Sequence, residues 1–464
     1  MKRTHSLVLL VTAWLAALAG LAVESVQQTK QDRPSQFLGS AEANSKEMIA
    51  QGRQVFRFDT FGDEAFWGGR LQLQQAVSTL SPRTALSLGL KVDSDALPAS
   101  VIAAIKTGMV NLDDPAVTLQ LIKQNAVLGV IGFFNNNSLS SIGFTCAVCH
   151  STVNDSIAPG IGQRIDGLAN RDLNLGAIVA SAPNLQPFVE LLKLAPQDAG
   201  ITVDDVRKVL KGWGPGKFDA ELFLDGKASN PQQITNGVVT DTNVSGATLL
   251  PNARGLSGHN LYTWTGGWGT VTYWNALVAN LELHGVGTFF DERFDNANQF
   301  PIAAAAKLGH VSTDPDHDQI TGKLAALNFY QLALPAAQPR PGVDFDPAAA
   351  ALGDVLFSGK ANCNSCHHEP LWTEPGWNQH SASELKIDSF EADRAPGHAY
   401  RTMNLAGIFI RERGLFMFPQ NKGRFYHDGR FKTLSDVVNS YNDRFSLGLT
   451  DAEKQNLVEY LKSL

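Results

Sequence analysis

The chain has 464 residues and is poor in cysteine, in charge and in long apolar stretches. Its four cysteines are too few for the dense disulfide framework of a small secreted domain. Charged residues make up 18% of the chain and the net charge is −7, so nothing favours nucleic acid or an anionic membrane surface as a partner. No apolar run after Val23 approaches the length of a membrane span. A hydrophobic content of 44% predicts a folded globular chain with ample core.

All four cysteines belong to two copies of one motif. The copies are Cys146-Ala147-Val148-Cys149-His150 and Cys363-Asn364-Ser365-Cys366-His367. Two thiols three positions apart can form thioether bonds to the two vinyl groups of a haem, and the next residue, histidine, can bind the iron. We therefore predict two covalently bound haem c groups, with His150 and His367 as proximal iron ligands.

Other sites could use the same cysteines. A four-cysteine zinc site, two disulfides or a C-x-x-C redox site are the alternatives. None of them requires a histidine directly after each cysteine pair, and both pairs have one. The haem interpretation accounts for both histidines.

The N-terminus predicts export. Lys2 and Arg3 precede an apolar run from Leu7 to Val23, and Gly20-Leu21-Ala22 offers small residues for cleavage. We expect a signal peptide over residues 1–22, with a retained membrane anchor as the alternative. Export to the periplasm, or otherwise out of a bacterial cytoplasm, agrees with haem c attachment. No membrane span is expected after cleavage.

The chain is predicted to be mainly α, with two cytochrome c-like haem domains. A proline-rich linker over 335–342 separates an N-terminal haem domain (23–334) from a C-terminal cytochrome c domain (343–464). Gly52-x-x-Val55-Phe56 returns as Gly353-x-x-Leu356-Phe357, one copy before each haem motif, which indicates an internal repeat. The first domain is expected to hold large loop-rich insertions, in which Phe66-Trp67-Gly68-Gly69 predicts a turn.

The C-terminal domain begins and ends with helices that the sequence marks clearly. Asp346-Pro347 predicts the start of a helix that runs through Phe357. Thr450-Asp451-Ala452-Glu453 has the pattern of a capping box for the last helix. We expect these two helices to cross with Gly353 facing Tyr460.

Two segments of this domain resemble a known family. Tyr400-Arg401-Thr402-Met403-Asn404-Leu405 and Phe425-Tyr426-His427-Asp428-Gly429-Arg430-Phe431 are similar to the C-terminal half of bacterial di-haem cytochrome c peroxidases and the related MauG proteins. The resemblance implies one haem that stores and passes electrons and another that meets peroxide or a different oxidant. It implies single-electron transfer by a peroxidase-like oxidoreductase, with a small cytochrome or cupredoxin as redox partner. A pure electron carrier and a MauG-like or rubber-oxygenase-like enzyme are the alternatives.

The resemblance also bears on the distal iron ligands. In the family the C-terminal haem takes a methionine in the peroxidases or a tyrosine in MauG, and the matching position here is Tyr441. Met403, Met417 and His427 remain alternatives. For the first haem the candidates are His284, His259 and Met109, and an open sixth position is a further possibility. A thioether ligand raises the reduction potential, whereas a phenolate lowers it.

Further residues are expected near the haems. Arg164 and Arg171 follow the first motif and could pair with haem propionates. Trp264 and Trp268 lie in a tryptophan-rich stretch and could line a haem or relay electrons, with core packing as the alternative. The sequence assigns no catalytic residue, and Glu64 and Glu282 are the candidates for a general base.

Overall fold

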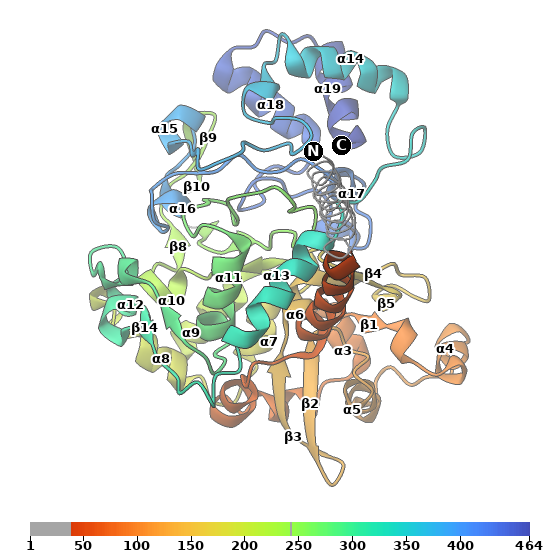
Figure 1. Ribbon diagram of the computed structural model, residues 1–464, viewed down its shortest axis with the longest axis vertical. Coiled ribbons are helices and arrows are strands. Elements are labelled where there is room, and N and C mark those ends of the chain that lie inside the picture. Colours follow the sequence, from red (N-terminus) through yellow and green to blue (C-terminus); the bar gives the residue numbers. More distant parts are fainter. Residues whose placement is uncertain (1–38, 242–243) are drawn as a thin grey trace, which may run out of the picture. The chain divides into compact units, whose positions relative to one another are not determined.

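The structure is a computed structural model that describes residues 39–241 and 244–464 (Figure 1). The predicted signal peptide lies outside these residues. The chain divides into two units, residues 1–51 and 52–464. In the first unit residues 39–51 are described, and they are helical. The following description concerns the second unit.

Helices make up most of the regular structure, in agreement with the predicted mainly α class. The α-helices are α2 (Leu73–Val77), α3 (Pro82–Ser87), α4 (Ala99–Lys106), α5 (Pro115–Lys123), α6 (Cys146–His150), α7 (Leu175–Ala180), α8 (Gln186–Leu192), α9 (Val203–Trp213), α10 (Leu222–Asp225), α11 (Val271–Leu277), α12 (Pro301–Ala306), α13 (Leu324–Ala333), α14 (Pro347–Ser358), α15 (Ala382–Leu385), α16 (Phe390–Asp393), α17 (Phe409–Arg413), α18 (Leu434–Phe445) and α19 (Asp451–Ser463). The chain also has two π-helical segments. One, η1 (Ala65–Arg70), precedes α2, and the other, η4 (Val278–Glu282), follows α11.

The strands among the described residues pair only two by two. They are β1 (Val92–Asp93), β2 (Val130–Asn135), β3 (Ser138–Phe144), β4 (Ser151–Val153), β5 (Ile161–Gly162), β6 (Arg164–Asp166), β7 (Lys217–Phe218), β8 (Ser229–Asn230), β9 (Gln233–Thr235), β10 (Val238–Asp241), β11 (Val244–Ser245), β12 (Thr248–Leu249), β13 (Phe289–Phe290) and β14 (His310–Val311). The longest pair is the antiparallel hairpin β2–β3, whose turn residues Asn136 and Asn137 have positive φ angles of 48° and 74°. This hairpin leads directly into the first cysteine motif.

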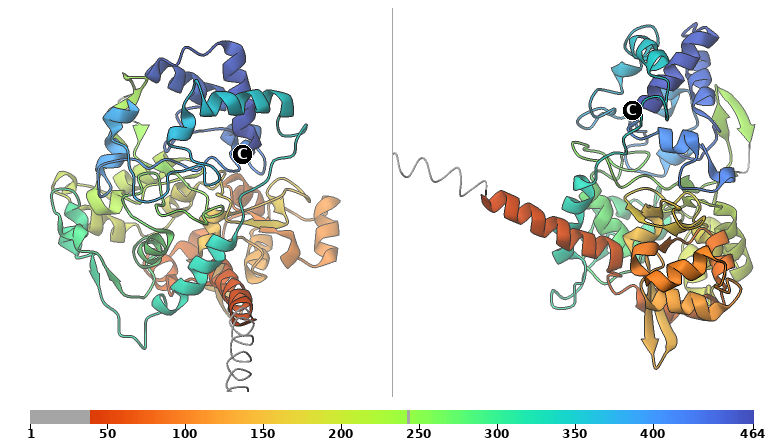
Figure 2. Two further views of the ribbon diagram at one scale, coloured as in Figure 1. Left: turned by 45° about the horizontal axis from the view of Figure 1, so that its top comes forward. Right: turned by 90° about the vertical axis from the view of Figure 1, so that its right-hand side faces the viewer.

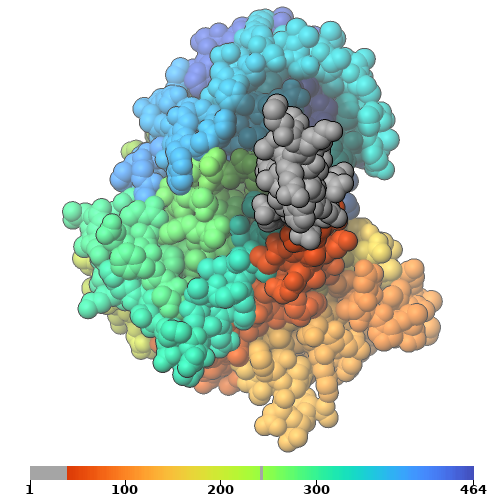
Figure 3. All heavy atoms as spheres, viewed as in Figure 1, coloured from red at the N-terminus to blue at the C-terminus, as the bar shows by residue number. Residues whose placement is uncertain are grey.

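The core of the second unit is divided among several hydrophobic clusters. The largest surrounds the first motif and includes Phe144, Val148 and Leu175. Another is built from α14, α18 and α19 around Phe357 and Tyr460. Figures 1 and 2 show these three helices lying together, and Figure 3 shows the same grouping of C-terminal residues in space-filling form. Each motif therefore has a hydrophobic cluster of its own.

The predicted helix crossing in the C-terminal part is confirmed. The Asp346 carboxylate accepts a hydrogen bond from the Ala348 N–H at 2.8 Å and caps α14. Thr450 and Glu453 form the expected capping box of α19. A Cβ atom on Gly353 would collide with the Asn456 carbonyl oxygen and lie 2.7 Å from Tyr460 Cβ. Only glycine allows the two helices to approach this closely.

The same packing occurs before the first motif. A Cβ atom on Gly52 would collide with the Ala326 carbonyl oxygen and lie 2.6 Å from Tyr330 Cβ in α13. The Phe56 ring contacts Tyr330 at 5.6 Å between centroids, as Phe357 contacts Tyr460 at 5.0 Å. The Gly-x-x-x-Phe repeat in the sequence thus corresponds to a repeated contact with a tyrosine on a second helix.

One local prediction was wrong. Phe66-Trp67-Gly68-Gly69 forms part of the π-helix η1 instead of a turn. Phe66 and Trp67 are both buried, and the Trp67 indole N–H donates to the Leu283 carbonyl at 3.0 Å. Gly68 lies against Ser141 of β3, where a side chain would collide. Burial of two aromatic rings and this close approach hold the segment helical.

No helix in the described part of the chain is both long enough and apolar enough to cross a bilayer.

Replacing Gly353 with alanine should lower the free energy of unfolding by about 1–3 kcal/mol, because the added methyl group overpacks the crossing of α14 and α19. The matched control is Gly212→Ala in α9, where nothing lies within 4 Å of the added Cβ. That change should be neutral or stabilising by about 0.4–1 kcal/mol. Denaturant unfolding of both variants measures the difference, and equal stability of the two would contradict the close crossing.

Candidate haem sites

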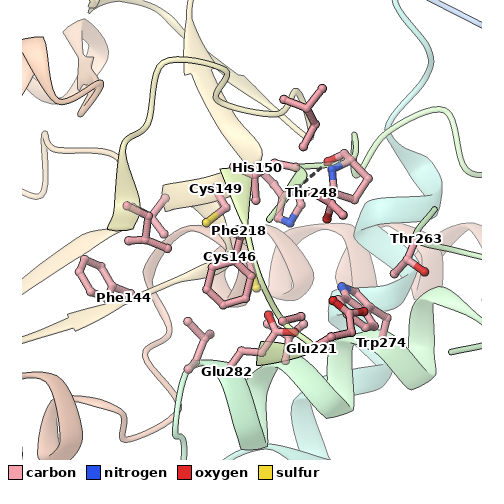
Figure 4. Close-up of a pocket in the computed structure, with 18 of the residues that line it drawn as sticks. Phe144, Cys146, Cys149, His150, Phe218, Glu221, Thr248, Thr263, Trp274 and Glu282 are labelled. Carbon is pink, nitrogen blue, oxygen red and sulfur yellow. Dashed lines mark hydrogen bonds between the residues drawn. The ribbon is translucent and has the colours of Figure 1, made fainter. Parts of the chain in front are cut away.

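The first motif opens into a partly enclosed cavity (Figure 4). Most of the lining is apolar, with aromatic walls from Trp67, Phe144, Phe218, Trp264 and Trp274. Figure 4 shows Cys149 and His150 on one side of the space and Glu221, Glu282 and Trp274 across from them.

The helix α6 places the motif at this cavity. Strand β3 ends at Phe144, and Thr145 then caps the helix by accepting a hydrogen bond from the Ala147 N–H at 3.2 Å. Residues three positions apart in a helix lie on the same face. One helical turn therefore directs both Cys146 and Cys149 toward the cavity, and both line it.

The His150 ring has one nitrogen engaged and one available. Its Nδ1 lies 3.0 Å from the Pro251 carbonyl oxygen, which accepts a hydrogen bond when Nδ1 carries the proton. This contact fixes the tautomer and leaves Nε2 as a lone-pair donor. Burial lowers the pKa of His150 to about 4, so the ring is neutral, as a metal ligand must be.

The donor set fits a haem c. Burial raises the pKa of Cys146 and Cys149 to about 12, so both are neutral thiols in an apolar setting. Two such thiols, a neutral imidazole with a free Nε2 and a largely apolar space match the needs of a covalently attached porphyrin.

The second motif repeats the histidine geometry. His367 Nδ1 lies 3.0 Å from the Trp372 carbonyl oxygen, and burial lowers the pKa of the ring. Phe357, Trp372 and Tyr460 form an aromatic group beside it, with ring centroids 5.0–6.1 Å apart. Burial also raises the pKa of the Cys363 thiol to about 11. These residues fit a second haem c.

The alternatives to haem find no support in the geometry. All four cysteines are free thiols. Cys149 packs against the cluster around the first motif and Cys363 against the C-terminal cluster. Within the described residues, the one group with metal-ligand spacing is Cys366, Glu374 and His380, which contains a single cysteine. The cysteine pairs are thus not brought together into a four-cysteine site.

The arginines and tryptophans singled out in the sequence have different surroundings. Arg164 is buried and pairs with Asp93 at 3.0 Å, whereas Arg171 is buried without a carboxylate partner among the described residues. Trp264 lines the first cavity and donates to the Leu249 carbonyl at 2.7 Å. Trp268 packs in a separate cluster and donates to Glu221 at 3.0 Å, so it reaches the cavity only through that glutamate.

The candidate distal ligands of the first haem lie elsewhere. The His284 ring stacks on Phe66 at 3.6 Å, and burial lowers its pKa to about 3. It contacts Trp67, which lines the cavity, but does not line it itself. Met109 is 75% exposed, and His259 is likewise absent from the cavity wall.

The candidates for the second haem are spread over several segments. Tyr441 lies in α18. Its ring centroid lies 5.8 Å from that of Phe445 and 4.5 Å from the guanidinium carbon of Arg444. Met417 packs in a cluster with Leu168 and Phe409, away from the C-terminal cluster. His427 is buried and stacks on Tyr400 at 5.4 Å. Met403 follows Thr402, and the backbone of Met403 acts on the pKa of His367. The distal ligand of the second haem stays a prediction.

Three glutamates line the first cavity, and two of them could not be expected from the sequence. They are Glu221, Glu282 and Glu391. Burial raises the pKa of each, and the charge of Glu221 raises the pKa of the other two further. One oxygen of Glu282 and one of Glu391 are buried without a hydrogen-bond partner in the described structure. Glu64, the other candidate base, accepts a hydrogen bond from Thr60 at 2.8 Å and does not line the cavity.

No protein-family model matches the chain. A cytochrome-c peroxidase of Denitromonas iodatirespirans is 28% identical over 198 residues, which cover 32% of this chain and 51% of that protein. The predicted similarity to cytochrome c peroxidases is confirmed. The match spans about half the length of the curated relative.

Two solved structures share a smaller likeness. The hydrazine synthase of Kuenenia stuttgartiensis is 17% identical, and the match covers 47% of this chain and 72% of that one. A MauG-like protein associated with microbial copper homeostasis is 18% identical, with 53% and 81% covered. The TM-score is 0.30 in both cases.

Each cysteine pair should carry one haem. We expect the intact mass of mature protein to exceed that of its polypeptide by two haems, and Cys146→Ala/Cys149→Ala and Cys363→Ala/Cys366→Ala each to lose one. Mass spectrometry of protein from a host that matures c-type cytochromes measures this. Retention of two haems in either double variant would contradict the assignment.

Burial of Glu391 should make stability depend on pH. Because its pKa is raised in the folded protein, the unfolded chain releases this proton first, and stability falls as pH rises from the ordinary glutamate value. Glu391→Gln is neutral at every pH and should reduce that loss. Denaturant unfolding between about pH 5 and pH 8 tests this. Parallel pH profiles for the parent and the variant would rule out a raised pKa.

Proposed function

We propose that this protein is an exported, periplasmic di-haem c-type oxidoreductase that reduces peroxide by single-electron transfer. The haem at His150 would be the site of reaction. The haem at His367 would receive electrons from a redox partner, for which a small cytochrome or cupredoxin is the proposed class. Reduction of one hydrogen peroxide to two waters consumes two electrons and two protons, so the reactive site must handle both.

The observation that carries the proposal is the composition of the first cavity wall. Apart from His150, no histidine, methionine, lysine or tyrosine is found among the described residues that line it. These are the side chains that ordinarily fill the sixth position of a haem iron. An electron carrier with six-coordinate irons needs such a ligand, whereas a site that binds peroxide needs the position open.

The cavity also contains groups that can move protons. Glu282 comes from η4, lines the cavity and has an unpartnered buried oxygen. A carboxyl group that keeps its proton in such a setting can donate that proton to a peroxide oxygen as the O–O bond breaks. The charge of Glu221 raises the pKa of both Glu282 and Glu391, so the three carboxyl groups lie near one another. Glu221 and Glu391 can therefore replace the protons consumed. A bound haem supplies the redox chemistry.

A short covalent and hydrogen-bonded path joins the two sites. Trp264 lines the first cavity, and its carbonyl accepts a hydrogen bond from the Arg401 N–H at 3.3 Å. The carbonyl of the next residue, Thr402, accepts a hydrogen bond from the Thr373 hydroxyl. Thr373 follows Trp372, whose carbonyl oxygen lies 3.0 Å from His367 Nδ1. Electrons passing from the second haem to the first can follow this segment, with the Trp264 indole at its end.

Spectra of the oxidised protein distinguish this proposal from its competitors. We expect one high-spin and one low-spin haem by electron paramagnetic resonance, with the high-spin signal changing on addition of peroxide. Two low-spin signals that peroxide leaves unchanged would establish the pure electron carrier. A peroxide reaction that needs a protein or polymer substrate for turnover would favour the MauG-like or rubber-oxygenase-like alternative.

Glu282→Gln should slow the reaction of the oxidised protein with peroxide by about 10²–10⁴-fold, because the amide cannot donate a proton to the peroxide oxygen. Stopped-flow absorbance measures the rate. The matched control is Glu190→Gln in α8, whose side chain is 61% exposed, and it should react at the parent rate. A Glu282→Gln variant that keeps the parent rate and both haems would exclude this role.

A further inference from the structure

Three arginine side chains meet beside the first motif. Arg171 follows β6, Arg411 lies in α17, and Arg424 precedes Phe425. Burial lowers the pKa of all three guanidinium groups. The charges of Arg411 and Arg424 lower the pKa of Arg171 further, and Arg424 does the same to Arg411. Three positive charges are therefore gathered in a poorly solvated place.

The Arg171 guanidinium has no hydrogen bond to any described residue, although the residue is only 5% exposed. The Arg411 Nε is also buried without a partner, while its Nη2 donates to the Arg424 carbonyl. Arg424 donates to the Pro215 carbonyl at 2.7 Å. All of the hydrogen bonds that Arg411 and Arg424 make are thus to neutral groups.

The nearest acidic group is already engaged. Asp172 pairs with the Lys91 ammonium at 2.6 Å and accepts from the Phe418 N–H and the Asn421 amide at 2.8 and 2.7 Å. It acts on the pKa of Arg424 but forms no ion pair with any of the three arginines. One carboxylate shared with a lysine leaves the group with an excess of positive charge.

Two other buried arginines of this protein do have carboxylates, whereas the buried Arg401 and Arg444 donate to carbonyl and hydroxyl oxygens. Arg394 pairs with Asp219 at 2.7 Å and Asp225 at 2.9 Å, and Arg430 pairs with Asp388 and Asp428. A buried guanidinium without an anion is strongly destabilising. Arg171 differs from these four arginines because its guanidinium has no hydrogen bond to a described residue, which indicates that its anion comes from outside the polypeptide.

We propose that Arg171, Arg411 and Arg424 form a carboxylate-binding site that holds a propionate of the haem attached at Cys146 and Cys149. Guanidinium groups bind carboxylates with paired hydrogen bonds, and each haem c carries two propionates. Arg171 also lies close enough to His150 for its charge to act on that ring. The inference rests on the proposed haem attachment, and it extends the site from the N-terminal part to α17 and the loop after it.

Reduction potentials test the assignment. Removing a positive charge beside a propionate makes reduction of the haem iron less favourable. Arg171→Gln and Arg411→Gln should therefore lower one of the two haem potentials and leave the other unchanged. The freed propionate should also take up a proton on reduction, so that this potential becomes pH-dependent. Arg171→Lys keeps the charge and should restore most of the parent value. Optical redox titration gives both potentials.

Three controls separate the possible sources of the anion. Arg207→Gln removes a charge from α9 that is paired with Asp204, and it should change neither potential. Potentials of the parent are also measured in acetate, phosphate and chloride at constant ionic strength. A propionate site should be insensitive to these anions. A shift with added acetate or phosphate that the arginine variants lose would identify a free anion and overturn the propionate assignment.

Unchanged potentials in Arg171→Gln and Arg411→Gln would overturn the proposal as well. Mass spectrometry keeps this failure distinct from failure of the proposed function, because parent protein without covalent haem would refute the haem attachment itself. Should Arg171→Gln fail to fold, Arg424→Gln provides the same measurement from a more exposed member of the group.

Discussion

The hydrogen bond between a proximal histidine and a backbone carbonyl is the interaction on which both sites depend. An imidazole has two similar nitrogens, and it binds iron reliably only when one of them is committed. His150 is held by Pro251 and His367 by Trp372, each at 3.0 Å. One partner lies 101 residues from its histidine in the sequence and the other only five. The same local chemistry is thus supplied by tertiary folding in one site and by a turn in the other.

Around this constant element the two sites differ in their polar groups. The first cavity is enclosed by aromatic walls and holds three carboxyl groups, whose pKa values burial raises. The second histidine is flanked by Phe357, Trp372 and Tyr460. A buried acid that readily keeps its proton suits a site of proton-coupled reduction, and an aromatic surround suits electron passage. The difference in surroundings is the physical basis for assigning different tasks to two identical motifs.

Several buried charges outside these places are paired. Arg394 and Arg430 each have two carboxylates, and Lys91 has Asp172. Exceptions occur next to the first motif, where Arg171 and Arg411 lack an anion and Glu282 and Glu391 lack a donor. These unpaired guanidinium and carboxyl groups indicate a ligand that carries negative charge at one edge, where the arginines lie, and reacts at its centre, where the glutamates lie.

The sequence by itself determined the features that local spacing controls. The two C-x-x-C-H motifs, the helix starts at Asp346 and Thr450, and the facing of Gly353 and Tyr460 follow from residues close together or from a known helix pattern. Tertiary structure decided the rest. Glu221 and Glu391 are 170 positions apart and carry no motif, so only folding could bring both to one cavity with Glu282. His284 and Phe66 looked like a ligand and a turn residue, yet they stack on each other because both rings are better buried than exposed. Chemistry that lies within one helical turn can be read from the chain, whereas chemistry that depends on which distant side chains share a desolvated space cannot.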